Sequence, residues 1–255
     1  MLGNDVVDLR DVDARPESFH VRFDQRVFSA AERRAIAQDP RPLARRWAHW
    51  GAKEAAYKLA KQIDPTLAFS PGRLVACYTE VAEIEAVEAA DYAHEADLAS
   101  VSNAVGRPFE RRGFLELPYS PAKGIRMLAL RSFETADRVH VVAVPVGSDW
   151  AEVEMAVEML GRDRTDLSAA VRELAVREGS RRLGVAVERI TIGREGRIPT
   201  LEIDGIRTSL SLSLSHHGRW IGYAMRPGID IEGQSGWARG WTELVGRAEN
   251  RVWTR

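Results

Sequence analysis

The sequence contains very little cysteine and no long hydrophobic run. Cys77 is the single cysteine in 255 residues, which excludes an internal disulfide and a metal site built from cysteine ligands. No uninterrupted apolar run reaches the roughly 18 residues that a membrane-spanning helix needs. The first residues, Met1–Asp5, have neither the basic nor the apolar region of a signal peptide. We therefore expect a cytoplasmic protein with no membrane partner.

The chain also lacks an overall excess of charge. Its 36 Lys and Arg residues nearly balance 37 Asp and Glu residues, so a net charge of −1 gives no field to attract nucleic acid. Hydrophobic residues make up 45% of the chain, enough for one large domain or two modest ones. Locally, residues 22–53 hold eight basic and three acidic side chains. This segment could steer an acidic partner or form a solvated helix surface.

Local signals predict helices and antiparallel strands in both halves of the chain. Ser29 and Glu32 have the spacing of a capping box, so a helix should begin near Ser29 and end before Pro40. Further helices should cover 43–63 and 168–183, and the acidic segment 80–97 should be a solvated helix face or loop. Strands are expected near the N-terminus from about Val6 and over 73–78, 113–117, 126–130, 138–144, 189–192, 200–203, 209–215 and 220–225.

The most informative stretch is Trp50–Lys58. Small apolar residues recur through it at helical spacing, so one stripe of the helix is apolar. Glu54 and Lys58 lie four residues apart on a neighbouring stripe, which places a carboxylate beside an ammonium group. On its own, such a pair is a solvated surface interaction worth about 0.2–0.5 kcal/mol. A chemical role for it depends on residues elsewhere in the chain.

Serine and leucine alternate over Ser209–Ser215. This period of two places the leucines on one face of a strand and the serines on the other. His216-His217-Gly218 ends the alternation and indicates a turn. A histidine at such a turn is most often a surface residue, although turns also carry binding residues.

Three polar groups far apart in the sequence are chemically complementary. Asp5 and Glu54 could hold Mg²⁺, which is commonly bound by one or two carboxylates and by substrate phosphates, if the first strand packs on the helix. Lys58 would reach the same phosphates as a mobile charge. Ser215 and His216 could bind a phosphate or ribose at the other end of the ligand. The chain lacks the Gly-x-Ser-x-Gly motif of serine hydrolases and a histidine pair spaced for zinc.

These residues lie in motifs that resemble those of the 4'-phosphopantetheinyl transferase superfamily. Trp50–Lys58 is similar to the motif Trp/Phe-x-x-Lys-Glu-Ala/Ser-x-x-Lys of that family. Gly3–Leu9 resembles its Gly-x-Asp motif, and residues 22–32 resemble its segment Arg-Phe…Arg-Val-Leu-Thr-x-x-Glu. Ser213–Trp220 resembles its Ser-Leu-Ser-His-Ser-Gly signature. Four motifs of one family in one chain make the resemblance specific.

The resemblance implies an α+β fold in which two related halves form a pseudo-dimer, each with helices packed on a small antiparallel sheet. The halves would span 1–147 and 148–255, with the active site between them, so a monomer would suffice. The implied enzyme is a holo-[acyl-carrier-protein] synthase, serving fatty-acid, polyketide or nonribosomal peptide biosynthesis. It would use Mg²⁺ to transfer 4'-phosphopantetheine from coenzyme A to a serine of an acyl or peptidyl carrier protein, releasing adenosine 3',5'-bisphosphate.

The resemblance also implies roles for individual residues. Asp5 and Glu54 would bind Mg²⁺, Lys58 would contact the pyrophosphate, and Glu54 could also deprotonate the incoming serine, directly or through water. Further residues would bind coenzyme A, namely Ser215, His216, Arg172, Arg197, Arg22 and Arg26.

The metal ligands, the origin of the order of the halves and the function each leave an alternative open. The segment Gly228–Glu232 is a second Gly-x-Asp-x-Glu match, so Asp230 and Glu232 are alternative metal ligands. We favour Asp5 because no Lys-Glu-Ala helix follows Glu232.

The order of the two halves is reversed relative to surfactin-type enzymes, which indicates a domain-level permutation or a tandem of single-domain units. The alternative function is a coenzyme A or carrier-protein binding module without transferase activity, and a weaker one is another magnesium-pyrophosphate enzyme.

Overall fold

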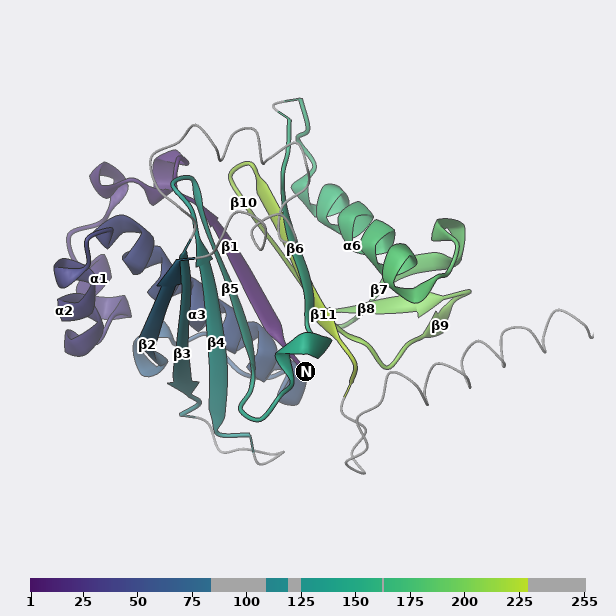
Figure 1. Ribbon diagram of the computed structural model, residues 1–255, viewed down its shortest axis with the longest axis horizontal. Coiled ribbons are helices and arrows are strands. Elements are labelled where there is room, and N and C mark those ends of the chain that lie inside the picture. Colours follow the sequence, from purple (N-terminus) through teal and green to yellow (C-terminus); the bar gives the residue numbers. More distant parts are fainter. Residues whose placement is uncertain (84–108, 119–124, 162, 229–255) are drawn as a thin grey trace, which may run out of the picture.

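The computed structural model describes residues 1–83, 109–118, 125–161 and 163–228 (Figure 1). Its N-terminal part is an antiparallel sheet with the strand order β1-β5-β4-β3-β2. The elements of this part are β1 (Gly3–Asp8), α1 (Phe23–Val27), α2 (Ala30–Gln38), α3 (Pro42–Ile63), β2 (Val75–Glu83), β3 (Phe109–Glu116), β4 (Met127–Glu134) and β5 (Arg138–Pro145).

The C-terminal part contains two smaller antiparallel sheets and a long helix. The strand orders are β10-β11-β6 and β7-β8-β9. Its elements are β6 (Glu154–Met159), α6 (Leu167–Leu183), β7 (Ile190–Glu195), β8 (Ile198–Ile203), β9 (Ile206–Arg207), β10 (Ser211–His217) and β11 (Trp220–Arg226). The predicted α+β class is confirmed. Among the helices described, none has the length and hydropathy needed to cross a membrane.

The helices begin and end close to the predicted residues. The capping box of α2 is present: the Ser29 hydroxyl accepts from the Glu32 N–H at 3.2 Å, and the Glu32 carboxylate accepts from the Ser29 N–H at 2.8 Å. The helix α3 begins at Pro42, where a proline loses no helical hydrogen bond, and ends at Ile63. These local signals fix the position of the Trp50–Lys58 stretch in the middle of α3.

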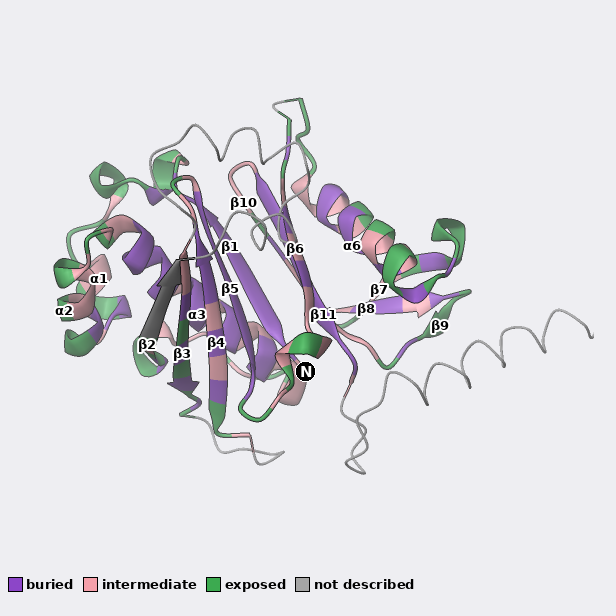
Figure 2. Ribbon diagram, in the orientation of Figure 1, coloured by how far each residue is buried: buried purple, intermediate pink, exposed green. Residues whose placement is uncertain are grey.

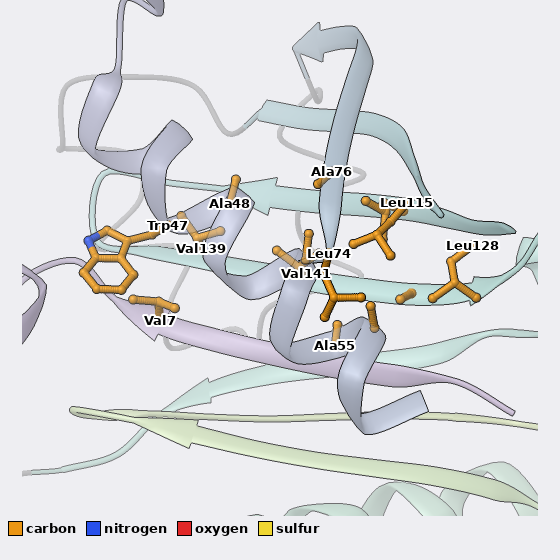
Figure 3. Packing of buried hydrophobic residues seen from close by; sticks show 14 of the residues in the cluster. Val7, Trp47, Ala48, Ala55, Leu74, Ala76, Leu115, Leu128, Val139 and Val141 are labelled. Atoms are coloured by element: carbon orange, nitrogen blue, oxygen red, sulfur yellow. The ribbon is translucent and has the colours of Figure 1, made fainter. Parts of the chain in front are cut away.

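The stripe of small residues on α3 packs against the five-stranded sheet. Ala52, Ala55 and Leu59 are each 0% exposed, and Figure 3 shows this helix lying against the sheet beside Val139 and Val141 of β5. Small side chains allow the helix to approach the sheet closely. A separate apolar cluster lies under α6 in the C-terminal part, and Figure 2 shows buried residues along β1, β11 and the inner faces of both helices.

The acidic segment 80–97 differs in part from the prediction of a solvated helix or loop. Its first residues, 80–83, continue β2, and the others lie outside the described residues. In the register of β2 and β3, Glu80 is opposite Arg112. The acidic composition therefore did not exclude a strand here.

The strand β6 was not predicted from the sequence. Its Met155 and Val157 are buried, whereas Glu154 and Glu158 form ion pairs at 2.6 Å with Arg181 and Arg177 of α6. The segment therefore alternates between apolar and paired acidic residues, which is the pattern of a strand covered on one face by a basic helix.

The two parts of the molecule meet along β1 and β10 (Figure 1). One edge of β1 pairs with β5, and its other edge donates backbone N–H groups to side chains of β10. The bonds are Asn4 N–H to Ser213 Oγ (3.0 Å), Val6 N–H to Ser215 Oγ (3.1 Å) and Asp8 N–H to His217 Nδ1 (3.2 Å). The serine face of β10 is thus buried against β1, while Leu212 on the opposite face enters the core under α6.

Candidate active site

Two glycines bring β1 against α3. A Cβ on Gly3 would lie 1.9 Å from the Ala55 carbonyl oxygen, and a Cβ on Gly51 would lie 2.9 Å from Cγ2 of Val141. Neither contact is possible for a larger residue without movement of the backbone or of the core. The same Gly51 Cβ position is 3.7 Å from Oδ2 of Asp5. Glycine at these two positions therefore places the Asp5 carboxylate directly beside the helix that carries Glu54 and Lys58.

Asp5 is the centre of a hydrogen-bonded cluster that joins both parts of the molecule. Its Oδ1 accepts from Lys58 Nζ at 2.9 Å and from Ser215 Oγ at 2.8 Å. Lys58 also donates to the Asn4 carbonyl oxygen at 2.9 Å. The ion-pair partner of Lys58 is Asp5, at 2.9 Å, and the charge of Lys58 also acts on Glu54, whose pKa it lowers. Within the described residues, Oδ2 of Asp5 accepts no hydrogen bond.

Glu54 interacts electrostatically with Asp5 and Lys58 of this cluster. Burial and then the neighbouring Asp5 carboxylate raise the pKa of Glu54 to about 7, against the lowering effect of Lys58. The Lys58 ammonium group is thus bonded to the Asp5 carboxylate and also acts electrostatically on that of Glu54. Such a site favours a bound cation, or a carboxylate that takes up a proton near neutral pH.

His216, at the end of β10, is on the leucine face of that strand, opposite the face of Ser215, but is close enough to Lys58 and Asp5 to feel their charges. Partial burial and then the positive charge of Lys58 lower the pKa of His216, whereas the Asp5 carboxylate opposes this effect. The histidine is therefore neutral at neutral pH. Of the residues predicted from sequence, Asp5, Glu54, Lys58, Ser215 and His216 all lie in one region of the molecule.

Two cavities adjoin this region and share Arg197. The first, of about 380 Å³, is lined by Tyr57, Lys58 and Lys61 of α3 and by Arg197 with its neighbours on β8. The second, also about 380 Å³, is lined by Arg172, Arg194, Arg197 and His216. Arg172 and Arg197, predicted from the family motifs, are thus together with His216. Arg194 was missed, and the concentration of arginine around the 193–199 turn is the signal that could have indicated it.

Two of the predicted residues lie away from this cluster. Arg22 and Arg26 are exposed residues at α1, and within the described part of the chain neither contacts Asp5, Lys58 or Ser215. The alternative metal ligands, Asp230 and Glu232, lie outside the described residues.

The two carboxylates fit a magnesium ion. Among the described side chains, no group of three or more His, Cys, Asp or Glu residues is arranged to hold a metal ion. Magnesium is usually held by only one or two carboxylates and completes its shell with water and substrate phosphates. Oδ2 of Asp5, which accepts no hydrogen bond from the described residues, and the carboxylate of Glu54, whose pKa is raised, could supply such ligands.

Lys53, which directly precedes Glu54, has a different environment. It is 0% exposed, and its Nζ donates to both carboxylate oxygens of Glu32 at 2.8 and 3.0 Å and to the Leu74 carbonyl oxygen. Glu32, which completes the capping box of α2, is therefore also the counter-ion of the buried Lys53 on α3. Lys53 holds the helices together, while Glu54 belongs to the cluster around Asp5.

Comparison with known families agrees with this geometry. Residues 1–96 match the model of a family described as the 4'-phosphopantetheinyl transferase superfamily. The match spans Asp5, Glu54 and Lys58 and confirms the resemblance that the motifs indicate. It supports a transferase that acts in phosphopantetheine transfer, with coenzyme A and a carrier protein as the partners typical of the family. No curated protein matches the chain.

Proposed function

We propose that the protein is a Mg²⁺-dependent 4'-phosphopantetheinyl transferase that modifies a serine of an acyl or peptidyl carrier protein. The observation that carries the proposal is the Asp5–Lys58–Ser215 cluster, which includes Glu54 in its field and joins both parts of the molecule. The superfamily match covers the segment that supplies the two carboxylates and the lysine. A site in the cytoplasm, where carrier proteins and coenzyme A are found together, follows from this function.

The proposed roles follow from the chemistry of each side chain. Asp5 and Glu54 would hold Mg²⁺, which when bound neutralises charge on the pyrophosphate of coenzyme A. Lys58, within reach of both carboxylates, would neutralise charge on the leaving phosphate. His216 would donate a hydrogen bond to coenzyme A. Arg172, Arg194 and Arg197 around the second cavity would bind further phosphate groups. A direct contact of Ser215 with coenzyme A stays a prediction.

The chain must also remove the proton of the attacking serine. In the transfer, the carrier serine oxygen forms a bond to phosphorus while a P–O bond of the pyrophosphate breaks, releasing adenosine 3',5'-bisphosphate. Glu54 is the carboxylate that we assign to accept the serine proton, directly or through a water molecule. The assignment comes from its place beside Asp5 and Lys58. Bound Mg²⁺ would lower the pKa of Glu54 below the value of about 7 that burial and Asp5 give it in the metal-free protein.

The strand order supports a pseudo-dimer of halves 1–147 and 148–255. In the first half, the first strand β1 pairs antiparallel with the last strand β5, which pairs with β4. In the second half, the first strand β6 pairs antiparallel with the last strand β11, which pairs with β10. A long helix, α3 or α6, follows the first strand in each half. A monomer would then contain both halves of the site.

The basic segment 22–53 supports an acidic carrier protein as the partner, but with fewer residues than its composition indicates. Three of its eight basic side chains, Arg45, Arg46 and Lys53, are buried. The exposed ones include Arg22 and Arg26, which we propose contact the acidic carrier surface instead of coenzyme A.

Mass spectrometry of an apo carrier protein incubated with coenzyme A and Mg²⁺ tests the function. Transfer adds about 340 Da, the mass of the phosphopantetheinyl group. Complex formation without this gain would support the binding module instead. Glu173→Gln is a control for Glu54→Gln, because the Glu173 side chain is 61% exposed on α6, and it should retain transfer.

A second pair of variants tests the metal ligands. Asp5→Ala should abolish transfer, and Asp230→Ala should retain it. Loss of transfer only in Asp230→Ala would assign the metal to the alternative motif.

A further inference from the structure

We propose that Ser215 is a positioning residue that orients the Asp5 carboxylate for metal binding, so that one half of the molecule sets the geometry of a ligand in the other. The inference rests on the proposed function, because it concerns the metal site of that function. Ser215 would then act on a side chain of the protein, whereas the family resemblance implies that it binds coenzyme A.

The hydrogen bonds of Ser215 engage its hydroxyl on both sides. The residue is 5% exposed, its Oγ donates to Asp5 Oδ1 at 2.8 Å, and it accepts from the Val6 N–H at 3.1 Å. A serine hydroxyl has one proton to donate, and that proton is directed at the carboxylate. Because the acceptor bond fixes the hydroxyl to the backbone of β1, the donor bond has little freedom to reorient.

The effect on Asp5 is to distinguish its two oxygens. Oδ1 accepts from both Ser215 and Lys58, whereas Oδ2 accepts from neither and lies toward Gly51. A carboxylate held through one oxygen presents the other in a defined direction, which is how hydrogen-bond partners of metal ligands raise metal affinity. Without Ser215, only the long and mobile side chain of Lys58 would hold Oδ1 in place.

The neighbouring serine on the same strand provides a matched control. Ser213 is 3% exposed, lies on the same face of β10, and its Oγ accepts from the Asn4 N–H at 3.0 Å. Ser213 and Ser215 thus make the same kind of bond to β1, but only Ser215 also donates to Asp5. Substitution of either serine by alanine leaves one buried N–H of β1 without its acceptor, and Ser215→Ala also removes the bond to the Asp5 carboxylate, so Ser215→Ala should lose more stability.

The test measures metal affinity directly. Binding of Mn²⁺, a paramagnetic substitute for Mg²⁺, is followed by electron paramagnetic resonance on the full chain without carrier protein or coenzyme A. We expect Ser215→Ala to weaken Mn²⁺ binding by about 10- to 100-fold, the range found when a partner of a metal ligand is removed. Ser213→Ala should stay within about twofold of the unsubstituted protein. Ser215→Thr, which keeps the hydroxyl, should regain most of the affinity.

Urea denaturation of the same variants separates a positioning effect from a general loss of structure. An unchanged Mn²⁺ affinity in Ser215→Ala, or an equal loss in both alanine variants, would overturn the proposal. So would an absence of Mn²⁺ binding to the unsubstituted protein. Because the readout does not require turnover, a protein that binds Mn²⁺ in a Ser215-dependent way without modifying carrier proteins would refute the proposed function alone.

Discussion

Replacement of Lys53 by methionine should strongly destabilise the protein while the residues of the candidate site remain present. Lys53 is fully buried and its ammonium group donates to both oxygens of Glu32, which is itself 2% exposed. Methionine fills nearly the same volume but leaves the buried Glu32 carboxylate without its counter-ion, although it still accepts from the N–H groups of Ser29 and Ala76. Removing one partner of such a buried pair typically costs about 3–5 kcal/mol.

The size of this loss makes it easy to measure. Domains of this kind have unfolding free energies of about 5–15 kcal/mol, so Lys53→Met would remove a large part of the total. Urea denaturation followed by tryptophan fluorescence gives the free energy of unfolding. Lys61→Met is the control, because Lys61 lies in the last turn of the same helix and is only half-buried, and it should cost less than about 1 kcal/mol.

A double-mutant cycle separates the ion pair from packing. In Glu32→Gln combined with Lys53→Met, both charges are absent, so the double variant should be more stable than the sum of the single losses predicts by about 2 kcal/mol or more. Additive losses, or a Lys53→Met variant within about 1 kcal/mol of the unsubstituted protein, would refute the role of Lys53 as a buried structural charge.

Three other predictions concern the fold and the site. Gly3→Ala should destabilise the protein by about 1–3 kcal/mol or more in urea denaturation, because the new Cβ would lie 1.9 Å from the Ala55 carbonyl oxygen; an unchanged midpoint would contradict the close approach of β1 to α3. Glu54→Gln should abolish transfer, measured by mass spectrometry, without loss of stability, because it removes a buried charge beside Asp5; an unfolded variant would mean that Glu54 is structural. Burial raises the pKa of Glu32, but its bonds to His49 and Lys53 outweigh this and lower it from 4.5 to about 2. Because this pKa is lower than in the unfolded chain, the ionised Glu32 carboxylate stabilises the folded protein, fully above pH 4.5. The free energy of unfolding should fall by about 3 kcal/mol in total as the pH falls toward 2. A Glu32→Gln variant with the same acid dependence as the unsubstituted protein would contradict this.

The helices could be predicted from the sequence because their signals are local. Ser29 and Glu32 mark the beginning of α2, and prolines precede or start α3, so no knowledge of distant contacts is needed. The strand β6 was missed because its acidic residues are stabilised by arginines of α6, which follow it in the sequence but lie over it only after folding.

The candidate site was predictable as a set of residues, but its internal contacts were not. The motifs indicate Asp5, Glu54 and Lys58 together, and the structure brings them to one place. Helical spacing places Lys58 beside Glu54, but it does not reveal that the close packing of β1 on α3 makes Asp5 the ion-pair partner of Lys58. Similarly, nothing in the alternation of serine and leucine reveals that the serine face of β10 packs on the edge of β1.

Lys53 illustrates the same limit for the basic segment. Composition alone counts it with seven other basic residues as a positive surface, although its charge is buried against Glu32. Which charges reach the surface is decided by the direction of each side chain from the helix axis relative to the sheet. The sequence pattern gives that direction only when the partner element is known.

The central claim is that Asp5 and Glu54 hold one divalent cation at the coenzyme A site. A crystal structure of the protein with coenzyme A and Mn²⁺, with the ion located by its anomalous scattering, tests this claim most directly. We expect a single peak within about 2–2.5 Å of a carboxylate oxygen of each residue and of a coenzyme A phosphate oxygen. A peak coordinated by Asp230 and Glu232, with Asp5 and Glu54 unliganded, would contradict it.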